Sequence, residues 1–257
     1  ISYNKNNWNA FASFSIGNKE PNRDDFEAGA EQQPKKETLY DLEIGLERRK
    51  ATTTWSATLY YMNYHNQLVL TGKVNDVGAY TRTNIASSYR LGLELQGSMR
   101  PRDWLRLQGN FTLSDNKVND FAEYLDDYDE GGQVINKYHK TDISFSPSLI
   151  AGATATFIPI PNAEIALIGK YVGKQYLDNT SRNDRSLSAF YVQDLRLRYT
   201  VKMKSSAQID LVFQVNNLFN KLYAPNGYSF SYIYDKTVNT ENYVYPMAGL
   251  NCIAGVN

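Results

Sequence analysis

Apolar and polar side chains alternate along several stretches of this chain, and this period of two constrains the fold more than any other feature of the sequence. Successive side chains of a β-strand point to opposite faces, so each stretch predicts a strand with one apolar and one polar face. The clearest stretches are residues 41–47, 89–96, 105–113, 191–199 and 209–216. A weak 3.6-residue repeat near Phe121–Tyr128 is too acidic for a buried helix. The pattern therefore predicts an all-β fold.

The same pattern predicts ten strands, many of which approach or exceed the ~10 residues of a tilted strand that spans a bilayer. An ordinary globular strand has only about 5–6 residues. The expected bounds are residues 8–17, 37–48, 52–66, 87–99, 104–115, 144–157, 163–175, 189–201, 207–219 and 243–257. Residues 69–84 are expected to hold strand extensions.

Short and long connections alternate along the whole chain. The short ones are residues 49–51, 100–103, 159–162 and 202–206, and the long ones are residues 18–36, 67–86, 116–143, 176–188 and 220–242. In a transmembrane β-barrel the short turns face the periplasm and the long loops face outside. The sorting therefore favours an antiparallel transmembrane barrel. A soluble sandwich with its long loops at one end is the alternative.

Composition agrees with the barrel and excludes several other classes. The chain has 27 basic and 27 acidic side chains, a balance that argues against a nucleic-acid partner. Its single cysteine forms no internal disulfide, and its two histidines lie far apart, so no metal centre is expected. No apolar run approaches the ~20 residues of a membrane helix. Tyrosines at strand ends are expected to form interfacial girdles, namely Tyr60, Tyr61, Tyr64, Tyr171, Tyr199 and Tyr245.

Several segments resemble, in order, those of TonB-dependent outer-membrane receptors. Residues 11–21 (FASFSIGNKEP) are similar to the strand that enters the family's G-x-x-x-P loop, and residues 34–46 (PKKETLYDLEIGL) to the KPE…YELGL strand that follows. Residues 215–223 (VNNLFNKLY) match the family's NNLF(D/N)xxY motif. Further similarities lie at residues 60–69, 89–95, 102–107 and 245–249. Together these segments cover nearly the whole chain, and residues 18–26 resemble the forms seen in Bacteroidetes receptors.

The resemblance implies that residues 1–257 are one incomplete domain, the C-terminal part of a barrel that has twenty-two strands in this family. The plug domain, the TonB-contacting segment and the N-terminal barrel strands are expected elsewhere in the receptor. Two features depart from the family: the chain stops at Gly255–Asn257 without a terminal aromatic residue, and Leu250 replaces a common arginine. The segment is therefore expected to need partner strands, although a barrel of ten strands can also close by itself.

By the same resemblance, the function is import of a scarce nutrient across the outer membrane of a Gram-negative bacterium, energised through TonB. An iron chelate, either a siderophore or haem, is the first expectation, with cobalamin or a glycan behind it. The expected partners are outer-membrane lipid, the TonB complex and, in some receptors of this kind, a surface lipoprotein. No covalent chemistry and no cofactor are expected.

The long loops combine aromatic and charged side chains, which suits ligand capture. Aromatic rings offer stacking area, and arginine offers charge-assisted hydrogen bonds to anionic groups. The expected substrate-binding residues are Tyr124, Tyr128, His139, Tyr176, Arg182, Arg185, Tyr232 and Tyr234. The same side chains can instead contact only one another or cover a partner lipoprotein.

Two further classes remain open from the sequence: a self-contained ten-strand outer-membrane enzyme or adhesin, and a soluble glycan-binding protein. For an enzyme, His139 and Asp142 are the nearest acid–base pair, but residues three apart on a strand point to opposite faces. The acidic run at residues 126–132 carries ligands that Ca²⁺ prefers but lacks the spacing of a calcium loop. A solvated external loop is the favoured interpretation of both.

Overall fold

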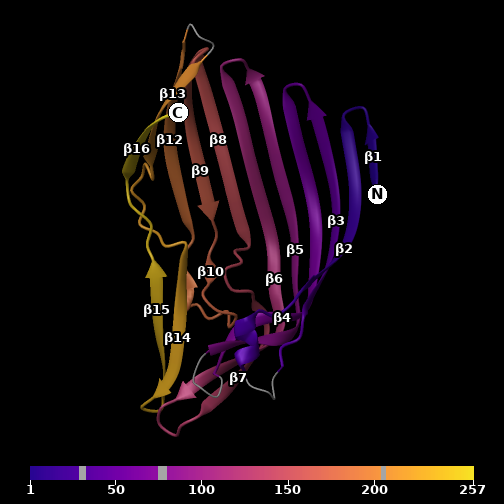
Figure 1. Ribbon diagram of the computed structural model, residues 1–257, viewed down its shortest axis with the longest axis vertical. Coiled ribbons are helices and arrows are strands. Elements are labelled where there is room, and N and C mark those ends of the chain that lie inside the picture. The colour runs from indigo at the N-terminus through magenta and orange to yellow at the C-terminus, as the bar shows by residue number, and fades with distance from the viewer. Residues whose placement is uncertain (29–32, 75–79, 204–206) are drawn as a thin grey trace.

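The structure is a computed structural model that describes residues 1–28, 33–74, 80–203 and 207–257. Its main element is a 14-stranded sheet whose central path runs β1-β2-β3-β4-β5-β6-β8-β9-β12-β13-β16. Figure 1 shows these strands standing side by side, with β1 at one edge and β16 at the other. Short turns lie at one end of the sheet and the long excursions at the other, as the sorting of loop lengths predicts.

The element bounds confirm long strands. They are β1 Ser2–Lys5, β2 Trp8–Lys19, η1 Arg23–Ala28, β3 Glu37–Lys50, β4 Thr53–Val74, β5 Tyr80–Arg102, β6 Leu105–Asp127, β7 Gln133–Asp142, β8 Leu149–Ile160, β9 Ala163–Val172, β10 Gln175–Tyr176, β11 Ser186–Leu187, β12 Phe190–Lys202, β13 Gln208–Asn216, β14 Asn226–Tyr234, β15 Thr237–Tyr245 and β16 Asn251–Val256. Within the described residues, no helix has the length and apolarity needed to cross a membrane.

The ten expected strands correspond to β2, β3, β4, β5, β6, β8, β9, β12, β13 and β16. The strand extensions expected within residues 69–84 are confirmed by the end of β4, which runs to Val74, and the start of β5 at Tyr80. Two expected loops are largely strand instead: residues 116–143 hold the end of β6 and all of β7, and residues 220–242 hold β14 and most of β15. These extensions carry the sheet well beyond the height of its central part, as Figure 1 shows.

The last expected strand, residues 243–257, is wrong as a single element. Residues 243–245 end β15, and β16 begins only at Asn251. Pro246 has no amide hydrogen to donate to a strand ladder, which is consistent with the break. Asn217, just after β13, holds the intervening turn: its side-chain amide donates to the carbonyls of Lys221 (2.9 Å) and Ala248 (3.2 Å). The NNLF motif thus has a structural role in closing this loop.

One face of the sheet is a continuous apolar surface. Ile44 pairs with Leu59, Leu59 with Leu93, and Leu93 with Leu113, which in turn pairs with Leu149. Leu59 and Leu113 are 51% and 52% exposed. Apolar patches on soluble monomers rarely exceed a few hundred Å², whereas this row crosses five strands. The surface suits contact with lipid.

The opposite face is polar and carries its own ion pairs. Arg106 of β6 lies 3.2 Å from Glu164 of β9, and Arg198 of β12 lies 3.0 Å from Asp210 of β13. Tyr60 and Tyr64 belong to this polar face, because Tyr60 pairs with Glu43. Their expected place in a lipid-facing girdle is therefore wrong.

Among the other expected girdle residues, Tyr61, Tyr171 and Tyr199 do lie on the apolar face, where Tyr171 pairs with Ala151 and Tyr199 with Leu211. Tyr245 ends the β15 hairpin instead, outside the main wall of the sheet. The register accounts for these differences, because a shift of one residue moves a side chain to the other face.

Candidate functional site

Two hairpins are joined at the long-loop end of the sheet. The strand β14 pairs in parallel with β6 at its far end. The Tyr128 amide donates to the Ile233 carbonyl (3.0 Å). The Asp129 carboxylate accepts hydrogen bonds from the amides of Asp235 (2.9 Å) and Lys236 (2.7 Å). These contacts fix the tip of the β14–β15 hairpin against the turn between β6 and β7.

A buried cation joins a third excursion, residues 173–189, to the same end. Arg185 is 1% exposed, and its Nη1 donates to carboxylate oxygens of Glu123 on β6 and of Asp178 (2.9 Å). Burial opposes the charge, but the bonds to Asp178 and Glu123 outweigh it and raise the pKa of the guanidinium. The Tyr138 hydroxyl donates to the other Glu123 oxygen (2.8 Å), and burial together with this bond raises the pKa of Tyr138 to about 12. Arg185 is thus part of the framework that supports the site.

A cavity of about 430 Å³ opens on the polar face, between these hairpins and the centre of the sheet. Its described walls come from residues 33–35 ahead of β3 and from the far ends of β4, β5 and β6. The lining side chains with a hydrogen-bonding or charged group are Gln33, Lys35, Asn66, Thr71, Lys73, Arg82, Thr83, Asn84, Asp120 and Tyr124. Three of these are cationic and one is acidic, and Asp25 of η1 pairs with one of the three cations, Arg82.

The cationic wall is held in place by neighbouring groups. Arg82 makes two bonds to the Asp25 carboxylate, at 2.7 and 2.6 Å. Burial of Asp25 is outweighed by the Arg82 bonds, which lower the pKa of the carboxyl below its ordinary value. The ammonium of Lys73 lies 5.4 Å from the centre of the Tyr124 ring. Asn84 bonds both the amide (2.7 Å) and the carbonyl (2.9 Å) of Lys35, which places that residue at the rim.

Gly72 shapes the wall of this cavity, and its replacement by alanine is expected to destabilise the loop end by about 1–3 kcal/mol. Its φ of +83° lies in the left-handed region, and an added Cβ would lie 2.3 Å from the Tyr124 carbonyl oxygen. Amide hydrogen exchange across the ends of β4 and β6 measures the change.

Gly131→Ala is the matched control, since Gly131 has φ +82° but nothing within 4 Å of an added Cβ. The control reports backbone strain alone, so we expect a smaller effect, about 1 kcal/mol. Equal effects of the two variants would show that the contact with Tyr124 does not shape the wall.

The structure brings together three of the expected binding residues. Tyr128 and Tyr232 meet edge to face, with ring centres 5.5 Å apart, and Tyr234 follows at the hairpin tip. Tyr128 and Tyr234 are both 61% exposed. The Tyr232 hydroxyl donates to Glu241 (3.2 Å), and this bond raises the pKa of Tyr232.

The other expected residues are dispersed. The ring of Tyr124 borders the cationic cavity, and Tyr176 stacks under the Lys174 ammonium at 4.4 Å. Arg182 pairs with Asp184 at 2.8 Å. His139 is highly exposed, and its ring nitrogen lies 2.5 Å from Asp120. The eight residues therefore do not line a single pocket.

The cationic wall formed by Lys35, Lys73 and Arg82 was not among the residues predicted from the sequence. The predicted binding residues all lie in the three later loops, where arginines and tyrosines cluster, and none lies in residues 18–36 or 67–86. A signal was nevertheless present, because both stretches lie at the long-loop end of adjacent strands. The cationic side chains of these two stretches are therefore expected at the same rim of the sheet.

The pair considered for acid–base chemistry, His139 and Asp142, does not form, because Asp142 accepts hydrogen bonds from Lys117 (2.6 Å) and Ser181 (2.9 Å). His139 instead meets Asp120, and both of these side chains are at least 75% exposed. In the acidic run considered for Ca²⁺, Asp127 accepts hydrogen bonds from the amides of its own turn. Within the described ranges, no group of three or more histidine, cysteine or acidic side chains is placed to hold a metal ion.

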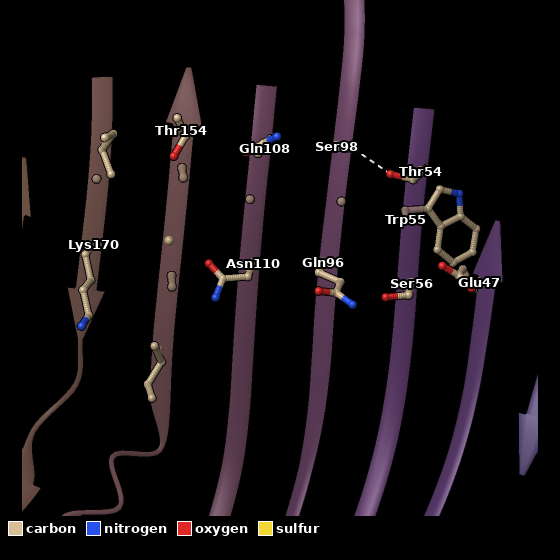
Figure 2. A pocket seen from close by; sticks show the side chains of 18 residues that line it. Glu47, Thr54, Trp55, Ser56, Gln96, Ser98, Gln108, Asn110, Thr154 and Lys170 are labelled. Atoms are coloured by element: carbon tan, nitrogen blue, oxygen red, sulfur yellow. Dashed lines mark hydrogen bonds between the residues drawn. The ribbon is translucent and has the colours of Figure 1, made fainter. Parts of the chain in front are cut away.

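A second hollow, of about 550 Å³, lies on the polar face closer to the short turns. Figure 2 shows Ser56, Gln96 and Asn110 on the neighbouring strands β4, β5 and β6, where the register makes them cross-strand partners. Asn110 covers Gly152, whose Cα leaves room for the amide. Most of the polar lining side chains are neutral amides and hydroxyls, with the charged Glu47 and Lys170 at opposite sides. The floor of the polar face is thus a surface for hydrogen bonding.

Comparison with known proteins matches this architecture to one family. Residues 1–218 match the family model described as TonB dependent receptor-like, beta-barrel. No curated protein sequence matches the chain.

Three solved structures share the fold. The siderophore receptor PiuA from Acinetobacter baumannii has a TM-score of 0.74 at 16% identity, over 99% of this chain and 34% of that one. The copper transporter OprC gives 0.69 at 16% identity, over 99% and 38%. The FrpB iron transporter from Neisseria meningitidis gives 0.66 at 17% identity, over 99% and 37%. The chain spans little more than a third of the length of these proteins.

Proposed function

This chain belongs to the TonB-dependent receptor β-barrel family, and from that premise we propose that it is the C-terminal barrel part of a receptor that imports an iron chelate, a siderophore or haem, with energy passed through TonB. As in other barrels of the outer membrane of Gram-negative bacteria, the apolar face meets lipid and the polar face lines the lumen. The long-loop end is then the extracellular end, and the short turns face the periplasm.

The cation-lined cavity carries the proposal. It lies at the extracellular end of the lumen face, where a ligand from outside arrives first, and its described lining holds Lys35 and Lys73 beside an Arg82 that is paired with Asp25. Lys35 and Lys73 offer charge to an anionic chelate, and the Tyr124 ring offers stacking area. Ferric siderophores with phenolate or catecholate donors, and haem with its propionates, combine negative charge with flat rings.

The hairpin tips supply the proposed first contacts. Tyr128 and Tyr234 stand exposed at the hairpin tips, and the half-buried Tyr232 packs edge to face on Tyr128. Tyr176, Arg182 and His139 form a looser outer set whose charges attract or orient a ligand. Arg185 supports these loops from the buried interior. A surface lipoprotein that covers the loops, the TonB complex and the plug are the proposed partners, and no covalent step is assigned to the barrel.

Reversing the cavity charge tests the proposal. In the complete receptor, the double variant Lys35→Glu/Lys73→Glu is expected to weaken binding of a ferric tris-catecholate by about tenfold or more, since charge-assisted bonds are worth about 1.5–3 kcal/mol each. Equilibrium binding by quenching of intrinsic fluorescence gives the dissociation constants. Uptake of ⁵⁵Fe by cells carrying the variant should fall in parallel.

The matched control is Lys202→Glu, which makes the same charge change at the opposite end of the sheet, on β12. It should leave both measurements at the wild-type level. Unchanged ferric chelate binding in the double variant, or equal loss in the control, would remove the cavity from the proposal. Tight binding of neutral cobalamin with no ferric chelate binding would overturn the choice of substrate.

A glycan is a second candidate because of the β14–β15 hairpin. One face of this ribbon carries Tyr228, Tyr243 and Tyr245, and the first two stack with ring centres 4.9 Å apart at 14°. Glu241 accepts the hydroxyls of Tyr232 and Tyr243 on the same face. Flat rings beside a carboxylate suit the apolar face and hydroxyls of a sugar. Oligosaccharide binding that Tyr228→Ala abolishes, without ferric chelate binding, would favour this candidate.

A further inference from the structure

A row of alternating cationic and aromatic side chains crosses the lipid-facing side of the sheet near the short turns. Lys5 pairs with Trp8, Trp8 with Arg48, and Arg48 with Trp55, on the neighbouring strands β1 to β4. Each of these residues shares the face of the apolar rows, since Leu46 and Ala57 form the next pair along the same two strands. The row therefore lies at the periplasmic edge of the lipid-facing surface.

Arg48 is at the centre of this row and is held without a counter-ion. Its guanidinium carbon lies 4.7 Å from the centre of the Trp8 ring, and Trp8 meets Trp55 edge to face at 5.4 Å. Its Nε is buried and has no hydrogen-bond partner, and no ion pair to Arg48 occurs among the described residues. A guanidinium in this position lacks an acceptor, which is costly if nothing else supplies one.

The local charge on this face is positive. Lys50 lies two residues beyond Arg48 on β3, on the same face and at the last position before the turn. The nearest acidic side chain in sequence, Glu47, points to the lumen side and bonds Arg49 at 2.6 Å. Lys5, Arg48 and Lys50 thus share one face at the level where a bilayer presents phosphate groups.

We propose that this row is a binding site for the phosphodiester of an anionic phospholipid, such as phosphatidylglycerol, in the periplasmic leaflet. The guanidinium of Arg48 donates to the phosphate oxygens, which supply the acceptor that Nε lacks. Trp8 and Trp55 flank the glycerol region, where amphipathic rings favour the membrane interface. Lys5 and Lys50 add charge, which selects a lipid without a headgroup ammonium. The site is independent of which nutrient the receptor imports.

Lipid titration of the delipidated complete receptor, followed by native mass spectrometry, tests the site. The probes are dioleoyl-phosphatidylglycerol and dioleoyl-phosphatidylethanolamine. We expect wild-type receptor to prefer the first, and Arg48→Gln to weaken its binding by about fivefold, the effect of one interfacial cation. Lys50→Gln, at the exposed last residue of β3, should give a similar loss.

Arg49→Gln is the matched control, because it removes the same charge from the adjacent residue on the lumen side. It should leave the lipid preference unchanged. An equal loss in Arg49→Gln, or no preference in the wild type, would overturn the site. Displacement of the lipid by 10 mM inorganic phosphate would overturn the lipid assignment in favour of a bare phosphate site, whereas retention of the lipid supports it.

Discussion

Replacing Arg185 by methionine is expected to destabilise the extracellular end of the barrel by about 3–5 kcal/mol, the cost of removing one partner of a buried ion pair. The change leaves Glu123, itself buried, and Asp178 without their shared cation. Because Asp178 belongs to the β9–β12 excursion and Glu123 to β6, the excursion should detach from β6, and both segments should open in one step. Amide hydrogen exchange of residues 175–187 and 121–125 should rise, while exchange at the centre of β12 stays slow.

Arg182→Met is the matched control, since it removes an exposed arginine three residues away. Its pair with Asp184 has both side chains at least 40% exposed, and such pairs contribute about 0–1 kcal/mol. The double variant Arg185→Met/Glu123→Gln should recover part of the loss, because it also removes one orphaned charge. If Arg185→Met resembled Arg182→Met, the buried cluster would not be what anchors the loops.

The wall of the barrel was predictable because its information is local. Alternation at residues 105–113 defines both a strand and its two faces, and the structure places Leu113 on the apolar face and Thr112 on the polar one. The alternation of short turns and long loops then orders neighbouring strands without any long-range contact. Each step uses only residues adjacent in the chain, which is why fold class and orientation follow from sequence.

The extracellular end was less predictable because its contacts join distant segments. The β14–β15 hairpin is fixed by Tyr232 pairing with Asp126 and by Asp129 capping the amide of Asp235, 106 residues away. The cationic cavity depends on Asn84 holding Lys35 across 49 residues. No local pattern encodes such pairings. The face of the sheet to which a tyrosine points likewise depends on the strand register. Tyr60 and Tyr61 are adjacent and look alike in the sequence, but Tyr60 faces the lumen.

The lipid-facing assignment leads to a large expected effect at Leu59. Leu59→Arg should destabilise the barrel by about 2–4 kcal/mol, the cost of a cation near the bilayer midplane. Leu59 is 51% exposed on the apolar face, between Ile44 and Leu93 on the adjoining strands. Trp55, which the lipid-site proposal places at the periplasmic edge, lies four residues before Leu59 on the same face of β4. Urea titration of the complete receptor refolded into phosphatidylcholine vesicles measures the change.

Thr58→Arg is the control that separates the membrane from the strand. Thr58 precedes Leu59 on β4 but faces the lumen, where it pairs with Gly45 on one side and Glu94 on the other. An arginine there gains an acidic neighbour and stays hydrated, so the free energy of unfolding should change by well under the Leu59 effect, about 0–1 kcal/mol. Both variants place the same bulk and charge on one strand, and only the surroundings differ. Equal losses would mean that strand propensity sets the cost, and a tolerated Leu59→Arg in a water-soluble protein would contradict the lipid-facing assignment of this surface.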